Sequence, residues 1–412
     1  MKNSINLEKI KEMSRPVGTK KMNIKGEAIN MDVYRIPLDM LYYNDQNDRI
    51  ATYISKYDSE NRNINDLELN EYNNQIEEFI VKSDKQKFND TKNNIKNLSQ
   101  LEPGVVFIDG RVIDGNRRFT CLRKLFKETG DQSFNYFEAV ILDSGITQKE
   151  IKLMELILQH GQEGKVDYNP IEKLVGIYRD LIDNKLFTVK EYAMSIDVKE
   201  SEVEKSLQLA KLMEEFLEYI NAPKQFYIAK DLEIDGPLNE VYSIKKRVEA
   251  DEEKWQNVKI TLFDHILMKT NNKDSGDITR IIRDYGKRVI SNDEAFETYF
   301  EEHEPLSRKL HEIINKCDGV VNTDYIRKEI REDSVLKNNI SEKLDEALYE
   351  AKRNEARKIP IELVSSINSD LQKLDLTMIS RISGDEKNEF TEEINKIKEK
   401  IEIIEGKLNE VI

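Results

Sequence analysis

The chain has 412 residues, of which 35% are charged and 38% hydrophobic, and its net charge is −15. This length predicts two or three domains, and the acidic balance argues against a protein that coats nucleic acid nonspecifically. Two cysteines and four histidines are too few for a disulfide framework or a zinc site. The sequence has neither a long apolar run nor a signal-like start, so we expect a cytoplasmic protein with no membrane partner.

The first part of the chain is polar. Residues 1–30 are predicted to form a flexible tail. An alternative is a mobile arm whose cations contact phosphates: Arg15, Lys20, Lys21 and Lys25. The folded part is expected to begin with a short strand at 31–36 that ends at Pro37, and the polar segment 66–98 has a helical pattern.

The densest strand signal lies between residues 101 and 143. Residues 104–108 are rich in β-formers, Asp109–Gly110 is a favoured hairpin turn, and a returning strand begins at Arg111. That strand leads into the sequence DGNRR at 114–118, which a helical pattern follows, and 136–142 supplies another strand. These elements predict an α+β domain at 31–147 with a small sheet.

The DGNRR turn has the features of a phosphate site. A helix N-terminus offers unpaired amides and a positive dipole, glycine lets a ligand approach the backbone, and arginine binds phosphate oxygens with two hydrogen bonds. The candidate residues are Asp114, Gly115, Asn116, Arg117 and Arg118, with Asp114 as a hydrogen-bond acceptor or metal ligand. The alternative is a surface turn whose arginines pair with local carboxylates.

Every periodic segment after residue 148 is helical in pattern. Asn169 as N-cap, Pro170 at the first position and Glu172 closing a capping box predict a helix start. Helices at 188–193 and 201–212 have the spacing of a helix-turn-helix, which also occurs in plain helical bundles. We expect a domain at 148–225 and a second at 226–350, where the segment 278–290 carries no motif with a known role.

The last segment, 351–412, is predicted to contain a coiled coil. Its apolar residues alternate spacings of four and three, as in an a/d heptad seam: Phe390, Ile394, Ile397, Ile401, Ile404 and Leu408. The seam either joins two chains as a homodimer or folds back on the helix at 361–374.

The ordered series of motifs resembles the N-terminal domain of the ParB/sulfiredoxin family. The DGNRR turn is similar to that family's G-[EN]-R-R phosphate turn, and Arg49 in Asn47-Asp48-Arg49 resembles its upstream Arg-containing box. DYNPIE at 167–172 resembles its D-L-N-P-I-E segment, and 188–213 its helix-turn-helix. The likeness covers roughly residues 31–215.

The resemblance implies a nucleoside triphosphate, CTP or ATP, bound with Mg²⁺, and Arg49 as a further nucleotide contact. The family's E-N-x-x-R box reads GQEGK at 161–165, so Gln162 or Glu163 would have to replace its metal ligands, with Asn169 and Glu172 as further candidates. The helix-turn-helix implies DNA contacts from Lys199, Ser201 and Lys205. The acids Glu200, Glu202 and Glu204 oppose this role, and leave a protein-contact element as the alternative.

Three functions follow from this resemblance. The first is a nucleotide-binding switch, with hydrolysis left open, that acts on DNA or on a protein partner. The second is an enzyme component, because the turn is also similar to the D-G-Q-Q-R turn of GmrSD-type restriction subunits, although the scarcity of histidines opposes a complete HNH-like nuclease. The third is a DNA-associated regulator or scaffold that does not turn over nucleotide.

Overall fold

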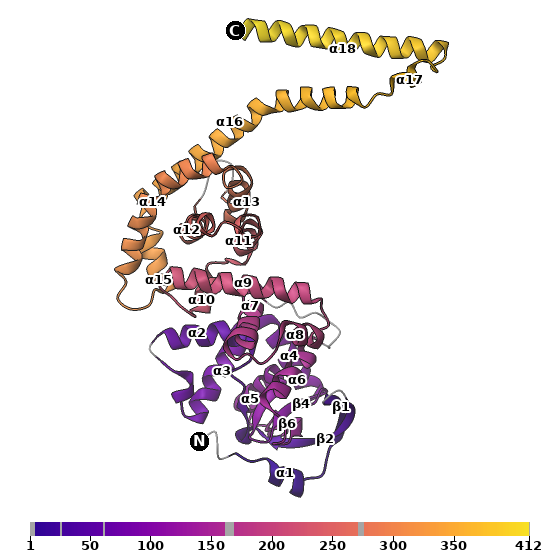
Figure 1. Cartoon of the computed structure of the whole chain (residues 1–412). Helices are drawn as coiled ribbons and strands as arrows, with labels where there is room; N and C mark the ends of the chain where they lie inside the picture. The colour runs from indigo at the N-terminus through magenta and orange to yellow at the C-terminus, as the bar shows by residue number, and fades with distance from the viewer. Residues whose placement is uncertain (1–4, 25–26, 61, 161–168, 271–275, 412) are drawn as a thin grey trace. The chain divides into compact units, whose positions relative to one another are not determined.

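A mixed six-stranded sheet with helices is followed by a long all-helical region (Figure 1). The computed structural model describes residues 5–24, 27–60, 62–160, 169–270 and 276–411. Among these residues no strand follows Leu142, and no helix is both long and apolar enough to cross a membrane. The predicted combination of an N-terminal α+β part with a helical remainder is therefore confirmed.

The sheet has the strand order β1-β2-β6-β4-β5-β3. Neighbouring strands are antiparallel except for the pairs β6–β4 and β5–β3, which are parallel. The strands are β1 (Gly18–Ile24), β2 (Glu27–Pro37), β3 (Tyr42–Tyr43), β4 (Gly104–Phe107), β5 (Arg111–Asp114) and β6 (Tyr136–Leu142).

Helices cover both faces of this sheet because its central strands are apolar on both sides. In β6, Phe137, Ala139 and Ile141 belong to one buried cluster, whereas Val140 and Leu142 belong to another, as the alternation of side chains along a strand requires. The first cluster lies under α3 (Leu69–Ser83), α4 (Lys85–Leu98) and α5 (Asn116–Thr129), and the second under α6 (Gln148–His160). The sheet is thus the middle of three layers.

The described residues before β2 are not a tail. Helix α1 (Glu8–Met13) follows Leu7, which is fully buried and donates a backbone hydrogen bond of 2.9 Å to the carbonyl of Ile108. Strand β1 pairs with β2 along its whole length and buries Met22 against the second cluster. The prediction of a flexible tail at 1–30 was wrong for these residues, because a polar edge strand gains its order from backbone pairing with β2.

The predicted hairpin and strand-to-helix turn are present. Strands β4 and β5 pair around Asp109–Gly110, where Gly110 has a left-handed φ of +90°. Strand β5 ends at Asp114, and α5 begins at Asn116. These elements follow from local sequence signals, which explains why the sequence predicted them closely.

The helical segment predicted at 66–98 is two helices, α3 and α4, separated by Asp84, whose side chain caps α4. Shorter helical segments before the sheet's central strands are η2 (Leu38–Met40), η3 (Asp48–Ile50), α2 (Ala51–Ser59) and η4 (Ile64–Asp66), and η5 (Gln132–Phe134) follows α5. Segment η3 carries Arg49 and lies against α3 and α7.

The helical region continues the chain with short connections. After α6 come α7 (Pro170–Tyr178), the π-helical turn η6 (Arg179–Asp183), α8 (Val189–Ser195), α9 (Glu200–Tyr219), α10 (Phe226–Asp231), α11 (Asp235–Val248), α12 (Glu252–Met268), α13 (Ile278–Arg288), α14 (Asp293–Asn315), α15 (Thr323–Tyr325) and the π-helical turn η7 (Ile326–Ile330). Asn169 caps α7 as predicted, and Thr188 with Glu191 forms a capping box on α8.

The chain divides into two compact units, residues 1–348 and 349–412. The long helix α16 (Ser334–Gln372) crosses this boundary, and the second unit continues with α17 (Leu376–Ile379) and α18 (Gly384–Val411). The predicted heptad seam lies on α18. The predicted boundaries within the first unit stay predictions.

A buried polar network stabilises the helical region. Asp264 on α12 accepts hydrogen bonds from the hydroxyl of Tyr219 and, at 2.9 Å, from Nε2 of His303 on α14. The Tyr299 hydroxyl donates to Nδ1 of His303 at 3.0 Å and accepts from Nε2 of His265 at 2.9 Å. Burial, and after it the nearby His303, lowers the pKa of His265 well below its usual value, so His265 is a neutral member of a buried hydrogen-bond chain that ends on the Asp264 carboxylate.

Substitution Asp264→Ala should lower the free energy of unfolding by about 3 kcal/mol, because it leaves buried His303 and Tyr219 without their acceptor. Urea denaturation followed by circular dichroism measures this change. The control Glu301→Ala, at an exposed position of α14, should change stability by less than about 0.5 kcal/mol. Equal effects of the two substitutions would contradict the role of the network.

Candidate nucleotide-binding site

The turn between β5 and α5 leaves the N-terminus of α5 open. Gly115 has a left-handed φ of +92°, and a Cβ atom there would lie 2.8 Å from the Phe137 ring, so glycine is required. No side chain caps the first amides of α5, in contrast to the caps on α7 and α8. The first amides of any helix lack partners within the helix, so this end presents open donors and a positive dipole.

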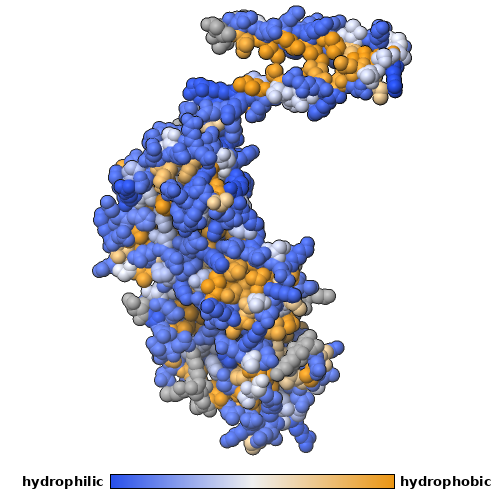
Figure 2. All heavy atoms as spheres, viewed as in Figure 1, coloured by the Kyte–Doolittle hydropathy of each residue, from blue (hydrophilic) through white to orange (hydrophobic). Residues whose placement is uncertain are grey.

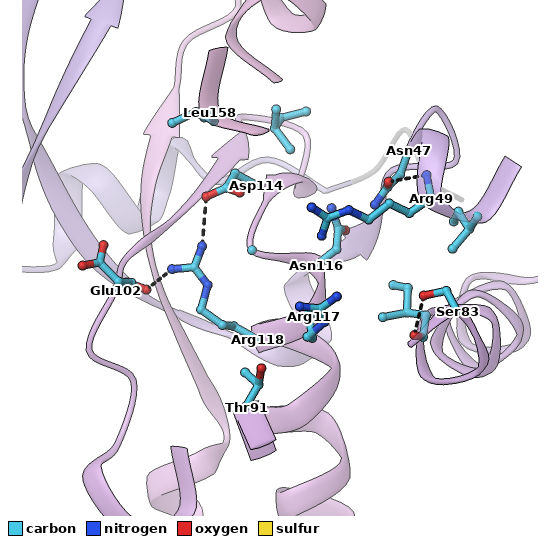
Figure 3. A pocket seen from close by; sticks show the side chains of 14 residues that line it. Asn47, Arg49, Ser83, Thr91, Glu102, Asp114, Asn116, Arg117, Arg118 and Leu158 are labelled. Carbon is cyan, nitrogen blue, oxygen red and sulfur yellow. Dashed lines mark hydrogen bonds and ion pairs between the residues drawn. The ribbon is translucent and has the colours of Figure 1, made fainter. Parts of the chain in front are cut away.

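These donors face a pocket of about 320 Å³. Figure 3 shows its polar lining, with Arg49 and Asn47 on one wall and the β5–α5 turn on the other. Its walls combine the turn with apolar side chains from α3, η3, β5 and α6; the lining residues are Asn47, Arg49, Ile50, Ile80, Ser83, Thr91, Glu102, Ile113, Asp114, Gly115, Asn116, Arg117, Arg118 and Leu158. The predicted candidates from 114–118 and Arg49 are thus brought together.

Arg118 is committed to the protein itself. Its guanidinium donates to the Glu102 carbonyl at 2.5 Å and to Oδ2 of Asp114 at 2.9 Å (Figure 3). Lys20 on β1 lies 3.8 Å from the same carboxylate and donates to the Pro103 carbonyl at 2.6 Å. Asp114 is therefore neutralised by two cations, and Arg118 fixes the turn against the 102–103 loop.

Arg117 has a different environment. Among the described residues, the carboxylate that it pairs with is that of Asp84, at a long 3.9 Å. Burial, and after it the positive charge of Arg49, lowers the pKa of Arg117. The two guanidinium groups come from opposite walls, and their mutual repulsion would be relieved by an anion placed between them. This end of the pocket is therefore suited to a polyanionic group such as phosphate.

The pocket also offers oxygen ligands for a cation. Oδ1 of Asn116 is buried and has no hydrogen-bond partner within the described part of the chain, and the Asp114 carboxylate lines the same space. The described residues contain no group of three or more His, Cys, Asp or Glu side chains arranged to hold a metal. These donors fit a magnesium ion that keeps waters and is held mainly by phosphates, which is its usual mode of binding.

Next to Arg49, a buried charge cluster anchors η3 to the helical region. The ammonium of Lys152 on α6 lies 3.2 Å from Asp48, 3.5 Å from Glu155 and 3.7 Å from Asp180 of η6. Burial would lower the pKa of Lys152, but the carboxylates raise it well above its usual value. Burial also raises the pKa of Asp180 to about 7, against the attraction of Lys152 and with the repulsion of Asp48 and Glu155.

Of the second-tier metal candidates, the two that the structure describes, Asn169 and Glu172, do not line the pocket. Gln162 and Glu163 lie outside the described residues. Asn169 accepts the backbone amide of Ile171 as an N-cap. Glu172 was predicted to close a capping box, which is wrong, because its carboxylate accepts a 2.5 Å bond from Lys230 on α10.

The predicted DNA-contacting residues Lys199, Ser201 and Lys205 are exposed at the start of α9, where they alternate with three exposed glutamates. Helices α8 and α9 pack against each other through Tyr192, Ala193 and Val203, which are buried. Two lysines among three acids give this segment no net positive charge, so nothing in its electrostatics attracts phosphate.

Sequence reasoning missed four residues that shape the site. Lys20 was assigned to a tail, although it pairs with Asp114. Asn47, which accepts the Arg49 amide at 3.1 Å, and Asp84 were not singled out as site residues. Lys152 could not have been identified, because only Glu155 is a local partner on α6, whereas Asp48 and Asp180 come from distant parts of the sequence.

The chain matches no protein-family model, and no curated protein matches it in sequence. The resemblance described above therefore rests on the sequence motifs of this chain alone.

Substitution Asp180→Asn should make the protein more stable relative to the wild type as pH rises. The pKa of Asp180 is raised in the folded state, so the stability that it contributes is complete below about pH 4 and is lost as pH rises through about 7. The difference in the free energy of unfolding between Asp180→Asn and the wild type, measured by urea denaturation, should increase by about 1 kcal/mol from pH 6 to pH 8. Parallel curves of unfolding free energy against pH for the wild type and Asp180→Asn would refute the assignment.

Proposed function

We propose that the chain is a ParB-like protein whose pocket binds a nucleoside triphosphate, CTP or ATP. The observation that carries this proposal is the convergence of Arg117 and Arg49 on the uncapped N-terminus of α5. Arg117, whose contact with the Asp84 carboxylate is long at 3.9 Å, and Arg49 on the opposite wall would together with the open backbone amides bind the oxygens of more than one phosphate group.

The shape of the pocket suggests how a nucleotide would lie. The phosphates would occupy the end formed by Gly115 and Arg117, and the base would lie against the apolar walls formed by Ile80, Ile113 and Leu158. The hydroxyls of Ser83 and Thr91 donate to the carbonyls of their own helices, so toward a base they offer acceptor lone pairs. An exocyclic amino group, which both cytosine and adenine carry, suits such acceptors.

Magnesium would enter with the nucleotide. Asp114 and Asn116 would supply oxygen ligands beside those of the phosphates, and the ion would neutralise phosphate charge. Arg118 and Lys20 already engage Asp114, so its carboxylate would act as a shared hydrogen-bond acceptor at the edge of the metal site.

We propose that the protein binds nucleotide and that the bound state of the pocket is communicated to the helical region. We prefer this function to that of a nuclease component. The link is η3, where Arg49 lines the pocket and the adjacent Asp48 contacts Lys152 of α6. The helix-turn-helix-like pair α8–α9 would then act as a protein-contact element or a weak DNA contact, given its glutamates. DNA stays a proposed partner through the resemblance alone.

Nucleotide binding by the full chain, measured calorimetrically with CTP, ATP and GTP in the presence of Mg²⁺, tests this function. Arg117→Ala should weaken binding about 10- to 100-fold, because one charge-assisted contact to phosphate is worth roughly 1.5–3 kcal/mol. The matched control Arg35→Ala removes an exposed arginine of β2 that pairs with Glu138, and it should leave affinity unchanged.

Comparison of Arg118→Ala with Arg117→Ala separates effects on nucleotide binding from effects on folding stability. Because Arg118 bonds to Glu102 and Asp114, its removal should lower thermal stability as well as affinity, whereas Arg117→Ala should lower affinity alone. Absence of binding to all three nucleotides, or equal affinity of the wild type and Arg117→Ala, would exclude the proposed function.

A further inference from the structure

The second unit carries two apolar seams. On α18 the seam places Ile394, Ile401 and Leu408 at heptad position a and Phe390, Ile397 and Ile404 at position d. The end of α16 and the residues after it repeat the same spacing with Val364, Ile367, Leu371 and Leu374. Figure 2 shows apolar side chains gathered along the facing sides of these two segments.

Both seams stay partly exposed in the single chain, although Phe390, Ile394 and Ile397 are half-buried. Val364, Ile367, Leu371 and Leu374 are 41–50% exposed, and Ile401, Ile404 and Leu408 are 47–63% exposed. The chain turns back through α17, where Met378, Ile382 and Phe390 line a groove of about 480 Å³. Contact within the hairpin therefore leaves about half of each seam uncovered.

The residue types of the seams indicate more than two helices. Isoleucine at both a and d positions, as on α18, disfavours a two-stranded parallel coil and favours three- or four-stranded assemblies. On α16, Ile361 and Leu363 widen the apolar face beyond the a/d stripe, and both are exposed. A face this wide is typical of a helix that contacts two neighbours in a bundle.

The charges of α18 are self-complementary in an antiparallel arrangement. Residues 384–394 carry five acidic side chains and one basic side chain, whereas residues 395–411 carry four of each. A parallel copy would place the acidic halves together, and an antiparallel copy separates them. In the antiparallel register that stacks Ile394 on Ile397, the g-position Glu393 lies opposite Lys400 of the second copy.

We propose that two copies of this chain associate through residues 359–411 as an all-antiparallel four-helix bundle, in which α18 packs against α18 of the second copy. Each copy contributes the end of α16 and α18, so both seams become covered. A two-fold axis near residue 396 makes the interface isologous, because each Glu393 meets the other copy's Lys400.

The exposed apolar surface is large enough for a stable pair. The apolar side chains exposed along the two arms are Ile359, Ile361, Leu363, Val364, Ile367, Leu371, Leu374, Ile401, Ile403, Ile404 and Leu408. Covering roughly 100 Å² of each removes about 1,000 Å² per copy from water, which meets the size of a standard stable interface. Self-complementary charge together with this area argues for a second copy over a different protein.

Sedimentation velocity of the full chain over a range of concentrations tests the proposal. The wild type should sediment as a dimer of about 97 kDa, twice the chain mass of 48.3 kDa. Ile397→Asp, at the centre of the seam, should give a monomer, because it places a charge in the bundle core. The control Leu98→Asp introduces the same charge at an exposed apolar residue of α4, outside the second unit, and should stay dimeric.

A charge exchange tests the orientation. Lys400→Glu and Glu393→Lys should each raise the dimer dissociation constant about 10-fold, because each places like charges opposite one another twice. An equimolar mixture of the two variants should recover the wild-type constant as a heterodimer. A parallel pair gives no such recovery, because its g residues face Lys398 and Glu405 instead.

A monomeric wild type at tens of micromolar, a dimeric Ile397→Asp, or a mixture that behaves like the separate variants would overturn the proposal. Circular dichroism of each variant shows whether its helices are retained. Recovery of dimerisation in the mixture shows in addition that both variant chains are still folded. The result is independent of the proposed nucleotide binding, because the variants lie outside the pocket and calorimetry on the same samples reports on that site.

Discussion

The left-handed backbone of Gly115 is the constraint on which the candidate site depends. It turns the chain from β5 into α5 within one residue, and the Phe137 ring fills the space that a side chain would need. Because the turn is this short, α5 starts at the sheet edge with its first amides uncapped. The carboxylate that could have capped the helix, Asp114, is instead held by Arg118 and Lys20.

Charge placement distinguishes this site from the rest of an acidic chain. Arg118 lies within hydrogen-bond distance of Asp114, so this pair is locally neutral, whereas Arg117 has only a distant carboxylate and is repelled by Arg49. Two neighbouring arginines of one motif thus differ in their surroundings: Arg118 holds the turn, and Arg117 is the one that would bind a ligand under the proposed function. Burial makes the second role effective, because electrostatic attraction is stronger where water is excluded.

Local signals predicted local structure. The Asp109–Gly110 hairpin, the DGNRR turn and the Asn169 cap depend on residues within a few positions of one another, and the structure has all three. Strand β1 was missed because its order comes from pairing with β2. Among residues 18–22 only Met22 is deeply buried, so this part of the strand shows no alternation of apolar and polar residues. The different surroundings of Arg117 and Arg118 could not be predicted from the sequence either, because Asp84 and the Glu102 carbonyl become their neighbours only in the folded chain.

Three consecutive residues connect the pocket with the helical region. Asn47 caps η3, Asp48 contacts Lys152 of α6 within a buried cluster that includes Asp180 of η6, and Arg49 reaches into the pocket. An anion that draws Arg49 toward Arg117 would pull on a backbone segment whose preceding residue, Asp48, is held by the buried ammonium of Lys152. Buried ion pairs resist small displacements and favour discrete arrangements, because a partly separated pair loses attraction without regaining solvation. The η3 turn is therefore the element through which occupancy of the pocket would reach α6 and η6.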